Sequence, residues 1–344
     1  MRSAQVTIKD IARELGISPS TVSKALKDHP DISKDTKIAV RKLAAKFNYR
    51  PNALALSLRN SKSNTIGLII PEVVHFFFST VVSGIEDVAY DAGYNVMMCQ
   101  SNESYFREVK NAQALLSSRI EGLLVSVSKD TKDFSHFYNF KKNNIPIVFF
   151  DRICEEMDTD RVIVDDYKGA YDAVNHLISI GCKRIAHFGT TSDLLIGKYR
   201  REGYIQALKD NNLPVDENLI LECDSYKAAK LITKRLIYER QPPDGIFSVN
   251  DLTAIGALQT IKENGFNIPE DFKIAGFGNG NYTTMTDPPL TTVEQFGYKI
   301  GEKAATLLLD RLLRGDDYPS ITEKIETQLI IRKSTIMRKE YWTG

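Results

Sequence analysis

The feature that most restricts the fold is an alternation of short apolar runs with amphipathic stretches, which begins at Thr65 and continues almost to the end of the chain. Helical patterns, such as those over 77–92, 167–180 and 301–314, lie between runs that have the length of buried strands. This alternation predicts parallel sheets covered by helices. We expect strands over 65–70, 94–99, 121–127, 145–150, 161–164, 184–188, 219–223, 244–249 and 273–277. Nine strands between residues 65 and 344 suit two lobes better than one sheet.

The first 62 residues differ in charge from the rest of the chain. They hold 13 Lys and Arg against 5 Asp and Glu, whereas the remaining residues hold 32 against 39, so a head of net charge +8 precedes a body of −7. A basic head on an acidic body indicates that the head meets a polyanion. A merely solvated basic face is the alternative that charge alone leaves open.

The stretch VTIKDIARELGISPSTVSKAL, residues 6–26, predicts two helices around a tight turn. Thr7 can cap the first helix with Asp10 as its partner. Gly16 suits the left-handed residue that ends this helix, and Ser18 followed by Pro19 begins the second. A third helix, capped by Ser33, is expected to carry the apolar residues Val40, Leu43, Ala44 and Phe47.

This arrangement is the geometry of a helix-turn-helix, whose second helix enters the major groove of DNA. Its small hydroxyl side chains allow a close approach to phosphates or base edges, and Lys24 can reach a guanine or a phosphate. An ordinary helical hairpin is the alternative. The outward residues expected at the N-terminal end of the second helix are Ser20, Thr21, Ser23 and Lys24.

The stretch YRPNALALSLRNSKSN, residues 49–64, joins the head to the body. Pro51 stops the third helix, and residues 52–58 predict a short, apolar helix. A helix this short is unstable alone in water because nucleation is costly. It therefore needs a partner to cover it, unless the segment is a plain interdomain linker.

Motifs throughout the chain resemble the lactose-repressor (LacI/GalR) family of bacterial transcription regulators. Besides the helix-turn-helix, the resemblance rests on IGLIIPE, EGLLV, PIVFFD, HLISIGCKRIAHFG, RREGY, SVNDLTAIGAL, PPLTTV and LIIRKST, in that order. It covers essentially the whole chain.

The resemblance implies a dimer that binds a pseudo-palindromic operator. In this family two hinge helices pair in the minor groove, where a leucine from each wedges a base step apart. Leu58 falls on that leucine's position, Arg59 follows it, and His29 matches a position that meets phosphate. The DNA-binding residues expected are Thr7, Ser18, Ser20, Thr21, Ser23, Lys24, His29, Asn52, Ala55, Leu58 and Arg59.

For the body, the resemblance implies a periplasmic-binding-protein-like fold of two Rossmann-like lobes with a ligand cleft between them. The chain should cross between lobes near residues 160, 290 and 322. The expected organisation is a head over 1–50, a hinge over 51–63, an N-terminal lobe over 64–160 with 292–321, a C-terminal lobe over 161–291 with 322–335, and a tail over 336–344.

Ligands of such sheets bind outside the carboxyl ends of the strands, so residues at those ends are candidates for effector contact. Asp165 or Asp166 should position a loop, and Asp251 should cap the helix that follows it. Phe77 and Phe78 match an aromatic contact of the family, Asp151 ends a strand, and Arg200 and Asn250 match pocket residues. The effector-binding residues expected are Phe77, Phe78, Asp151, Arg200, Asn250 and Gly278.

Two positions depart from the family's pattern. The glycine-rich stretch AGFGNGN, residues 275–281, lacks the spacing of a dinucleotide-binding loop and predicts a cleft loop instead. Within it, Gly278 stands where the family keeps a ligand-binding aspartate, so Gly278→Asp suggests itself as a probe. Ser225, with Tyr226 beside it, stands where the family often has an aromatic residue.

The function expected is that of a DNA-binding regulator, most simply a repressor, controlled by a sugar or related metabolite. A regulator controlled by a protein partner, with a degenerate pocket, is the alternative; a transport receptor or an enzyme fits less well. The five histidines are dispersed, and those of the body should be structural. No metal or other cofactor is expected, Cys99, Cys154, Cys182 and Cys223 should be free thiols, and the absence of a signal peptide or apolar span predicts a cytoplasmic protein.

Overall fold

The computed structural model describes residues 6–49, 63–191, 194–315 and 318–336, which belong to two compact units, a head over 1–64 and a body over 65–344. The head consists of helices α1 (Ile8–Leu15), α2 (Pro19–Leu26) and α3 (Lys34–Lys46). Their apolar faces enclose a small core centred on Ile11, Val22 and Val40, which are fully buried. Gly16 has φ of +63° and ends α1, as its position in the sequence predicts.

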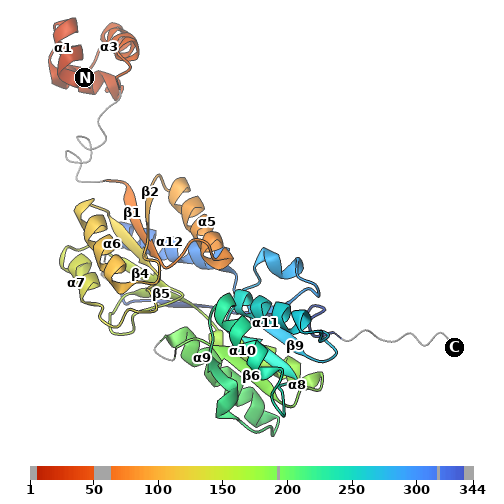
Figure 1. The fold of residues 1–344 in the computed structure, drawn as a ribbon. Coiled ribbons are helices and arrows are strands. Elements are labelled where there is room, and N and C mark those ends of the chain that lie inside the picture. The colour runs from red at the N-terminus through yellow and green to blue at the C-terminus, as the bar shows by residue number, and fades with distance from the viewer. Residues whose placement is uncertain (1–5, 50–62, 192–193, 316–317, 337–344) are drawn as a thin grey trace. The chain divides into compact units, whose positions relative to one another are not determined.

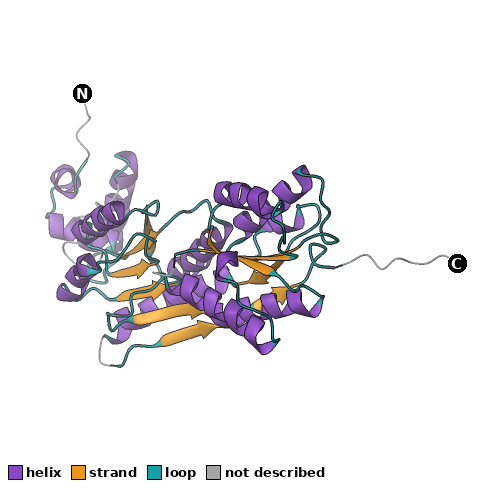
Figure 2. Cartoon of the chain, turned by 60° about the horizontal axis from the view of Figure 1, so that its bottom comes forward, coloured by secondary structure: helices purple, strands orange, loops and turns teal. Residues whose placement is uncertain are grey.

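The body contains two six-stranded sheets, each covered by helices on both faces (Figures 1 and 2). The first sheet has the order β11-β5-β4-β3-β1-β2, and all of its strands pair in parallel. Its elements are β1 (Thr65–Ile70), α5 (Phe76–Asp91), β2 (Asn95–Gln100), α6 (Tyr105–Ser117), β3 (Gly122–Val125), α7 (Ser135–Lys142), β4 (Ile147–Phe150), β5 (Asp160–Val164), α12 (Gly297–Arg314) and β11 (Thr322–Ile325).

The second sheet has the order β12-β10-β9-β8-β6-β7, with β12 antiparallel to β10 and the other pairs parallel. Its elements are α8 (Asp166–Ser179), β6 (Ile185–Gly189), α9 (Leu195–Asp210), η1 (Glu217–Leu219), β7 (Ile220–Glu222), α10 (Tyr226–Leu236), β8 (Gly245–Ser248), α11 (Asp251–Glu263), β9 (Lys273–Phe277), η2 (Asn281–Thr284), β10 (Thr291–Glu294) and β12 (Gln328–Ile330). The fold class expected from the sequence is therefore present.

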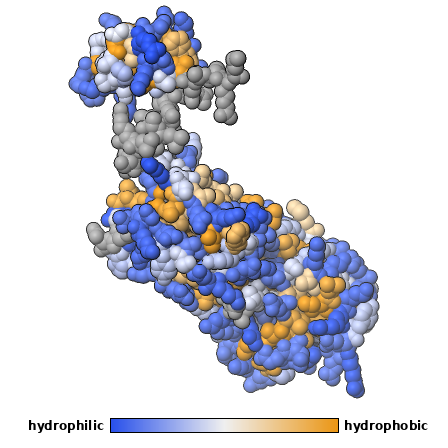
Figure 3. Space-filling view, turned by 60° about the vertical axis from the view of Figure 1, so that its left-hand side comes forward, coloured by the Kyte–Doolittle hydropathy of each residue, from blue (hydrophilic) through white to orange (hydrophobic). Residues whose placement is uncertain are grey.

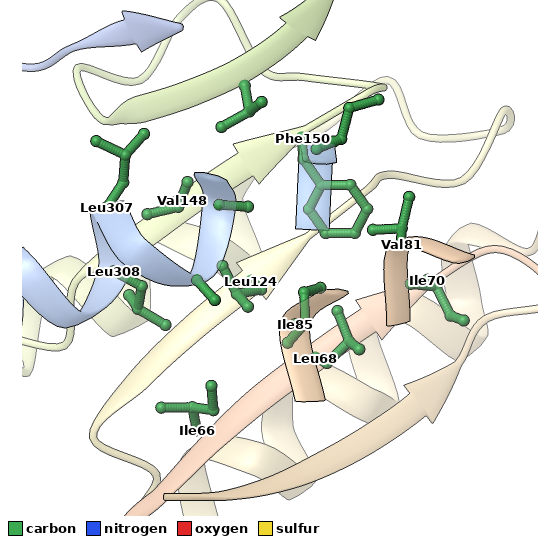
Figure 4. Close-up of a cluster of buried hydrophobic side chains, with 14 of the residues drawn as sticks. Ile66, Leu68, Ile70, Val81, Ile85, Leu124, Val148, Phe150, Leu307 and Leu308 are labelled. Atoms are coloured by element: carbon green, nitrogen blue, oxygen red, sulfur yellow. The ribbon is translucent and has the colours of Figure 1, made fainter. Parts of the chain in front are cut away.

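Successive side chains of the central strands point to opposite faces of each sheet and pack into two separate hydrophobic cores. In the first lobe, Ile66, Leu68 and Ile70 of β1 pack with α5 and α12 (Figure 4). Ile69 points to the opposite face and packs with α6 and α7. Helices α5 and α12 cross closely because Gly84 and Gly301 lack side chains: a Cβ on Gly301 would lie 2.1 Å from the backbone oxygen of Val81. In the second lobe, α10 and α11 cover one face, and α8 and α9 the other.

The structure corrects the predicted lobe boundaries. Both β5 and β11 pair within the first sheet, although residues 161–164 and 322–325 were assigned to the second lobe, and β10 belongs to the second sheet up to Glu294. Each crossing therefore lies a few residues later than predicted, at 165, 295–296 and 326–327. The physical reason is that the buried backbone N–H and C=O groups at the end of a strand need hydrogen-bond partners, which the neighbouring strand of the same sheet supplies.

All nine predicted strands form, with ends displaced by up to two residues, but three further strands were missed. These three, β10, β11 and β12, have the sequences TTVE, TEKI and QLI, which are short and partly polar. Helix α12 also begins four residues earlier than predicted, and the predicted loop after AGFGNGN contains the single 3-10 turn η2. The four cysteines are free thiols, and no helix among the described residues is long and apolar enough to cross a bilayer.

Candidate functional site

The N-terminal end of α2 carries a cluster of hydroxyl groups. Ser18 Oγ accepts a hydrogen bond from the backbone N of Thr21 at 3.1 Å and so caps the helix. The same Oγ lies 2.7 Å from Ser20 Oγ and 2.8 Å from Thr21 Oγ1. Three hydroxyls predicted to contact DNA are thus connected to one another, and Ser23, half-buried, lies on the following turn.

The carboxylate of Asp31, in the loop after α2, lies beside two residues predicted to contact DNA. Lys24 Nζ and His29 Nδ1 each lie 3.3 Å from Asp31 Oδ2, and all three side chains are exposed. Exposed pairs of this kind contribute little to stability. A DNA phosphate can therefore replace Asp31 at small cost.

The predicted cap of α1 is also formed. Asp10 Oδ2 accepts hydrogen bonds from the backbone N of Thr7 at 2.9 Å and from Thr7 Oγ1 at 2.6 Å. These bonds lower the pKa of Asp10 and hold its charge at the positive end of the helix dipole. The hinge residues Asn52, Ala55, Leu58 and Arg59 lie outside the described residues, so their predicted roles stay predictions.

A cavity of about 370 Å³ lies in the body at the carboxyl ends of strands from both sheets. It is lined from the first lobe by residues after β1 and β4, and from the second by residues of α9 and by residues after β8 and β9. All of the predicted effector-binding positions line this one cavity, namely Phe77, Phe78, Asp151, Arg200, Asn250 and Gly278. Their role in binding stays a prediction, but the structure brings them together.

Two aromatic rings form part of the first lobe's wall. Phe77 and Phe78 meet edge to face, with ring centroids 5.2 Å apart, at the start of α5. The Phe78 ring is buried and lies 6.0 Å from the guanidinium of Arg152. Such rings offer apolar faces on which a sugar or a base can stack.

Asp151 is held in an unusual state at the end of β4. Its backbone is left-handed, with φ of +58°, and its side chain is 6 % exposed. Burial raises the pKa of its carboxyl to about 6, although Arg152 nearby opposes the shift. A buried residue keeps a left-handed backbone of this kind only where its surroundings impose it.

Arg200 is already occupied by protein partners. Its Nε and Nη2 lie 2.7 Å and 2.6 Å from Asp166 Oδ1, and Nη1 donates to the backbone oxygen of Val249 at 2.6 Å. Its guanidinium stacks 3.7 Å from the centroid of the Phe277 ring. Asp166 therefore positions this arginine, whereas Asp165 caps α8 through the backbone N of Lys168.

The residue that caps α11 is Asn250, not Asp251 as predicted. Asn250 caps α11, since its Oδ1 accepts from the backbone N of Thr253 at 2.9 Å, and its Nδ2 donates to the backbone oxygen of Asp224. Asp251 is the first residue of the helix instead, and its buried carboxylate accepts from the backbone N of Gly280 and from Thr292 Oγ1. The prediction that Asp251 caps the helix was wrong because the two adjacent residues are both suitable caps.

The two departures from the family's pattern both lie at the cavity. Ser225 caps α10, and Tyr226 is the first residue of that helix. Gly278 has φ of +132°, and a Cβ there would lie 3.1 Å from Asp251 Oδ2. Gly278→Asp would therefore strain the backbone and place a second carboxylate beside the first, so it is a poor probe of this cavity.

Sequence reasoning missed several charged residues of the cavity wall. Arg152 Nη1 contacts Glu103 at 2.9 Å and 2.7 Å through the two carboxylate oxygens. Lys129 of the first lobe lies 3.6 Å from Asp224 of the second, and Thr190 also donates to Asp224, at 2.9 Å. Asp224 could have been predicted as a cavity residue, because it directly follows a predicted strand and precedes Ser225, which the sequence did single out.

The body histidines divide into two kinds. His136 and His176 are hydrogen-bonded to Glu108 and Thr335, and burial lowers the pKa of His187 to about 4. His75, by contrast, lines the cavity and lies 3.1 Å from Glu72 Oε2, although the sequence suggested a structural role. Among the described residues, no cluster of His, Cys, Asp or Glu could hold a metal ion.

Two family models match the chain. Residues 7–52 match the bacterial regulatory proteins of the lacI family, and residues 63–336 match the periplasmic binding proteins and sugar binding domain of the LacI family. Together the two matches cover the head and both lobes.

Relatives of known name span nearly the whole chain. The transcriptional repressor CytR of Escherichia coli is 33% identical over 330 residues, which cover 96% of each chain. Catabolite control protein A of Priestia megaterium is 31% identical and covers 96% of this chain and 99% of its own. The transcriptional repressor PurR of Vibrio atlanticus is also 31% identical, with coverages of 96% and 98%.

Solved structures show the same architecture. The LacI family regulator of Enterococcus faecium with bound ribose is 30% identical, with a TM-score of 0.71 over 80% of this chain and 100% of that one. The lac repressor dimer bound to operator and the anti-inducer ONPF has a TM-score of 0.84 over 97% of this chain and 100% of that one. At 23% identity the latter likeness is one of fold.

Proposed function

This chain belongs to the lacI family of bacterial regulatory proteins and is a DNA-binding transcription regulator; we propose that it is a repressor whose affinity for operator DNA is set by a small-molecule effector. One observation carries the proposal. A capped helix-turn-helix with exposed hydroxyls is joined to a body whose cavity gathers all of the predicted effector-binding positions. In this proposal the protein acts in the cytoplasm, where its operator is.

The DNA contact proposed for the head is made by α2 in the major groove. Ser20 and Lys24 are exposed, and the Ser18 cap fixes the end of the helix that carries them. Hydroxyl groups at a helix N-terminus suit phosphate and base-edge contacts, and the ammonium group of Lys24, on the last turn of α2, adds a positive charge. The hinge over 51–63 adds the minor-groove contact, with Leu58 as the wedge.

A homodimer is proposed because a pseudo-palindromic operator requires two heads. Apolar patches interrupt the hydrophilic surface of the protein (Figure 3). On the first lobe, Tyr90 of α5 is 82% exposed, and Met97 and Met98 of the edge strand β2 are 43% and 44% exposed. On the second lobe, Leu231 and Met285 are exposed. Contiguous apolar patches, unlike single exposed side chains, are typical of protein interfaces.

Effector control follows from the arrangement of the body. The cavity wall draws residues from both lobes, so a ligand that contacts both favours one relative lobe position over others. Such a ligand needs only a different affinity for the two states, and a coupling of about 1–3 kcal/mol is typical. Control by a protein partner is the competing proposal, since the cations of the cavity already have carboxylate partners.

The test begins with selection of an operator from random DNA by the purified full chain. Fluorescence anisotropy then measures affinity for that operator and for scrambled DNA, over a range of salt concentrations. Removal of residues 1–60 should abolish operator binding, and retained sequence-specific binding would overturn the head assignment. A thermal-shift screen of sugars, sugar phosphates and nucleobases identifies the effector, and an effector that leaves operator affinity unchanged would favour a protein partner.

A further inference from the structure

The carboxylate of Asp251 is enclosed by the three alternating glycines of AGFGNGN. Its Oδ2 accepts from the backbone N of Gly280 at 2.9 Å. A Cβ on Gly276 would lie 2.5 Å from Oδ1, and a Cβ on Gly278 would lie 3.1 Å from Oδ2. Glycine is therefore needed at 276 to leave room for this carboxylate, and at 278 it leaves a space beside the carboxylate.

The space beside Gly278 belongs to the effector cavity. Gly278, Gly280, Asp251 and Gln295 all line that cavity. Of the three atoms nearest to a Cβ at Gly278, only Asp251 Oδ2 lies closer than 3.7 Å. An oxygen or nitrogen of a ligand at this point would thus be at hydrogen-bonding distance from Oδ2 and at ordinary contact distance from Gln295 Oε1.

Gln295 lies at the same end of the cavity. Its side chain is only 5 % exposed and lines the cavity wall. Its amide can both donate to and accept from a polar ligand held there.

We propose that Asp251 is the carboxylate through which the cavity recognises its effector, with a hydroxyl or amino group of the effector in the space beside Gly278. This inference rests on the effector control proposed above. The sequence suggests that a ligand-binding carboxylate is lost at position 278, but Asp251 supplies one from the neighbouring helix. Each carboxylate oxygen can accept two hydrogen bonds, so Oδ2 can accept from a ligand as well as from Gly280.

The chemistry of the site defines the class of effector. A phosphate or carboxylate beside Gly278 would be repelled by Asp251, whereas a sugar or nucleoside hydroxyl would be bound. Elsewhere in the cavity Lys129, Arg152 and Arg200 are paired with Asp224, Glu103 and Asp166. Because these cations are neutralised, an effector without net negative charge fits best.

The test uses the purified full chain and isothermal titration calorimetry. The panel is ribose, cellobiose and neutral nucleosides, with ribose 5-phosphate and glucose 6-phosphate as anionic counterparts. Asp251→Asn should weaken binding of the neutral ligand by at least about tenfold, because the neutral amide loses the charge-assisted bond. This variant can keep its fold, since Asn accepts from Gly280 through oxygen and donates to Thr292 through nitrogen.

Gly278→Ala is the second variant, because its methyl group fills the space directly. Gly278→Ala is expected to lower stability because position 278 has a left-handed φ, so its melting temperature is measured first. If Gly278→Ala does not fold, the proposal is tested by Asp251→Asn alone. Asp172→Asn, which removes a carboxylate of the same lobe that does not line the cavity, is the control for charge and should bind as the wild type does.

Three outcomes are informative. Loss of binding in Asp251→Asn with normal binding in Asp172→Asn supports the proposal. Wild-type affinity in Asp251→Asn, or tighter binding of a phosphorylated ligand than of its neutral parent, overturns it and leaves effector control intact. If no panel member binds the wild type, effector control by this class fails, and this inference fails with it.

Discussion

Lys129 and Asp224 face each other across the cavity, one from each lobe, with Nζ and Oδ2 3.6 Å apart. Thr190 Oγ1 donates to the carboxylate of Asp224, and Asn250 Nδ2 donates to its backbone oxygen, so two hydrogen bonds hold Asp224 in place. The Lys129–Asp224 pair is a direct contact between the lobes in the wall of the cavity.

The Lys129–Asp224 bridge should make a small, salt-sensitive contribution to stability. Both side chains are partly exposed, at 41% and 30%, so we expect a coupling of about 0.2–1 kcal/mol between Lys129→Ala and Asp224→Asn. The measurement is a double-mutant cycle on thermal unfolding at low salt and at about 1 M salt, where screening should remove the coupling. Additive single effects at low salt would show that the bridge does not form in solution.

Asp151→Asn should stabilise the protein at pH 7.5 by about 1–3 kcal/mol. The folded pKa is raised from 3.8 to about 6, so the folded protein binds more protons than the unfolded chain between those values. The ionised carboxylate therefore destabilises the fold above pH 6, and the penalty fades as the pH falls toward 3.8. Asn also tolerates the left-handed backbone at this position.

The measurement for Asp151 is the melting temperature of wild type and variant at pH 7.5 and pH 4.5. The gain should shrink at the lower pH, and a gain equal at both would mean that the charge is not its cause. Glu270→Gln removes an exposed carboxylate and serves as the control.

Arg200→Ala should destabilise the protein by about 3–5 kcal/mol, because it leaves the buried Asp166 without its partner. Urea unfolding measures the loss, and the further change Asp166→Asn should recover part of it. A double variant as unstable as Arg200→Ala would show that lost packing on Phe277 dominates. Loss of effector response in Arg200→Ala is therefore interpretable only when its folding has been checked.

Leu58→Ala should reduce affinity for the selected operator by about tenfold or more while leaving affinity for scrambled DNA nearly unchanged. A wedge acts only when the hinge helices pair on the correct site, whereas non-specific binding depends on phosphate contacts. Anisotropy titrations on both DNAs give the two affinities. Equal losses on the two would contradict a wedge.

Most of the fold and part of the site could be predicted from the sequence. The central strands are nearly continuous apolar runs because both faces of each sheet are covered, and such runs are visible without tertiary information. The strand TEKI could not be seen in the same way, because β11 lies at a sheet edge and three of its four residues are not buried. Edge strands depend on pairing with distant segments more than on composition.

The cap of α11 shows what could not be predicted at the site, because Asn250 and not Asp251 takes that position. Both residues suit a helix cap, so local pattern could not decide between them. The choice is made by Thr292 and Gly280, which lie 41 and 29 residues away and offer donors to Asp251. The importance of Asp224 was hidden for the same reason, since Lys129 belongs to the other lobe.

The three crossings between the lobes have a mechanical consequence. Two of them are joined side by side, because the backbone N of Asp165 donates to the oxygen of Ile325 at 2.9 Å and its carboxylate meets Lys324 at 2.6 Å. Two lobes linked by three short connections, two of which are hydrogen-bonded to each other, retain little freedom to slide or twist independently. Their easiest motion is rotation about one axis. Ligands of quite different shape should therefore rotate the lobes about this same axis and differ only in the angle of rotation that they produce.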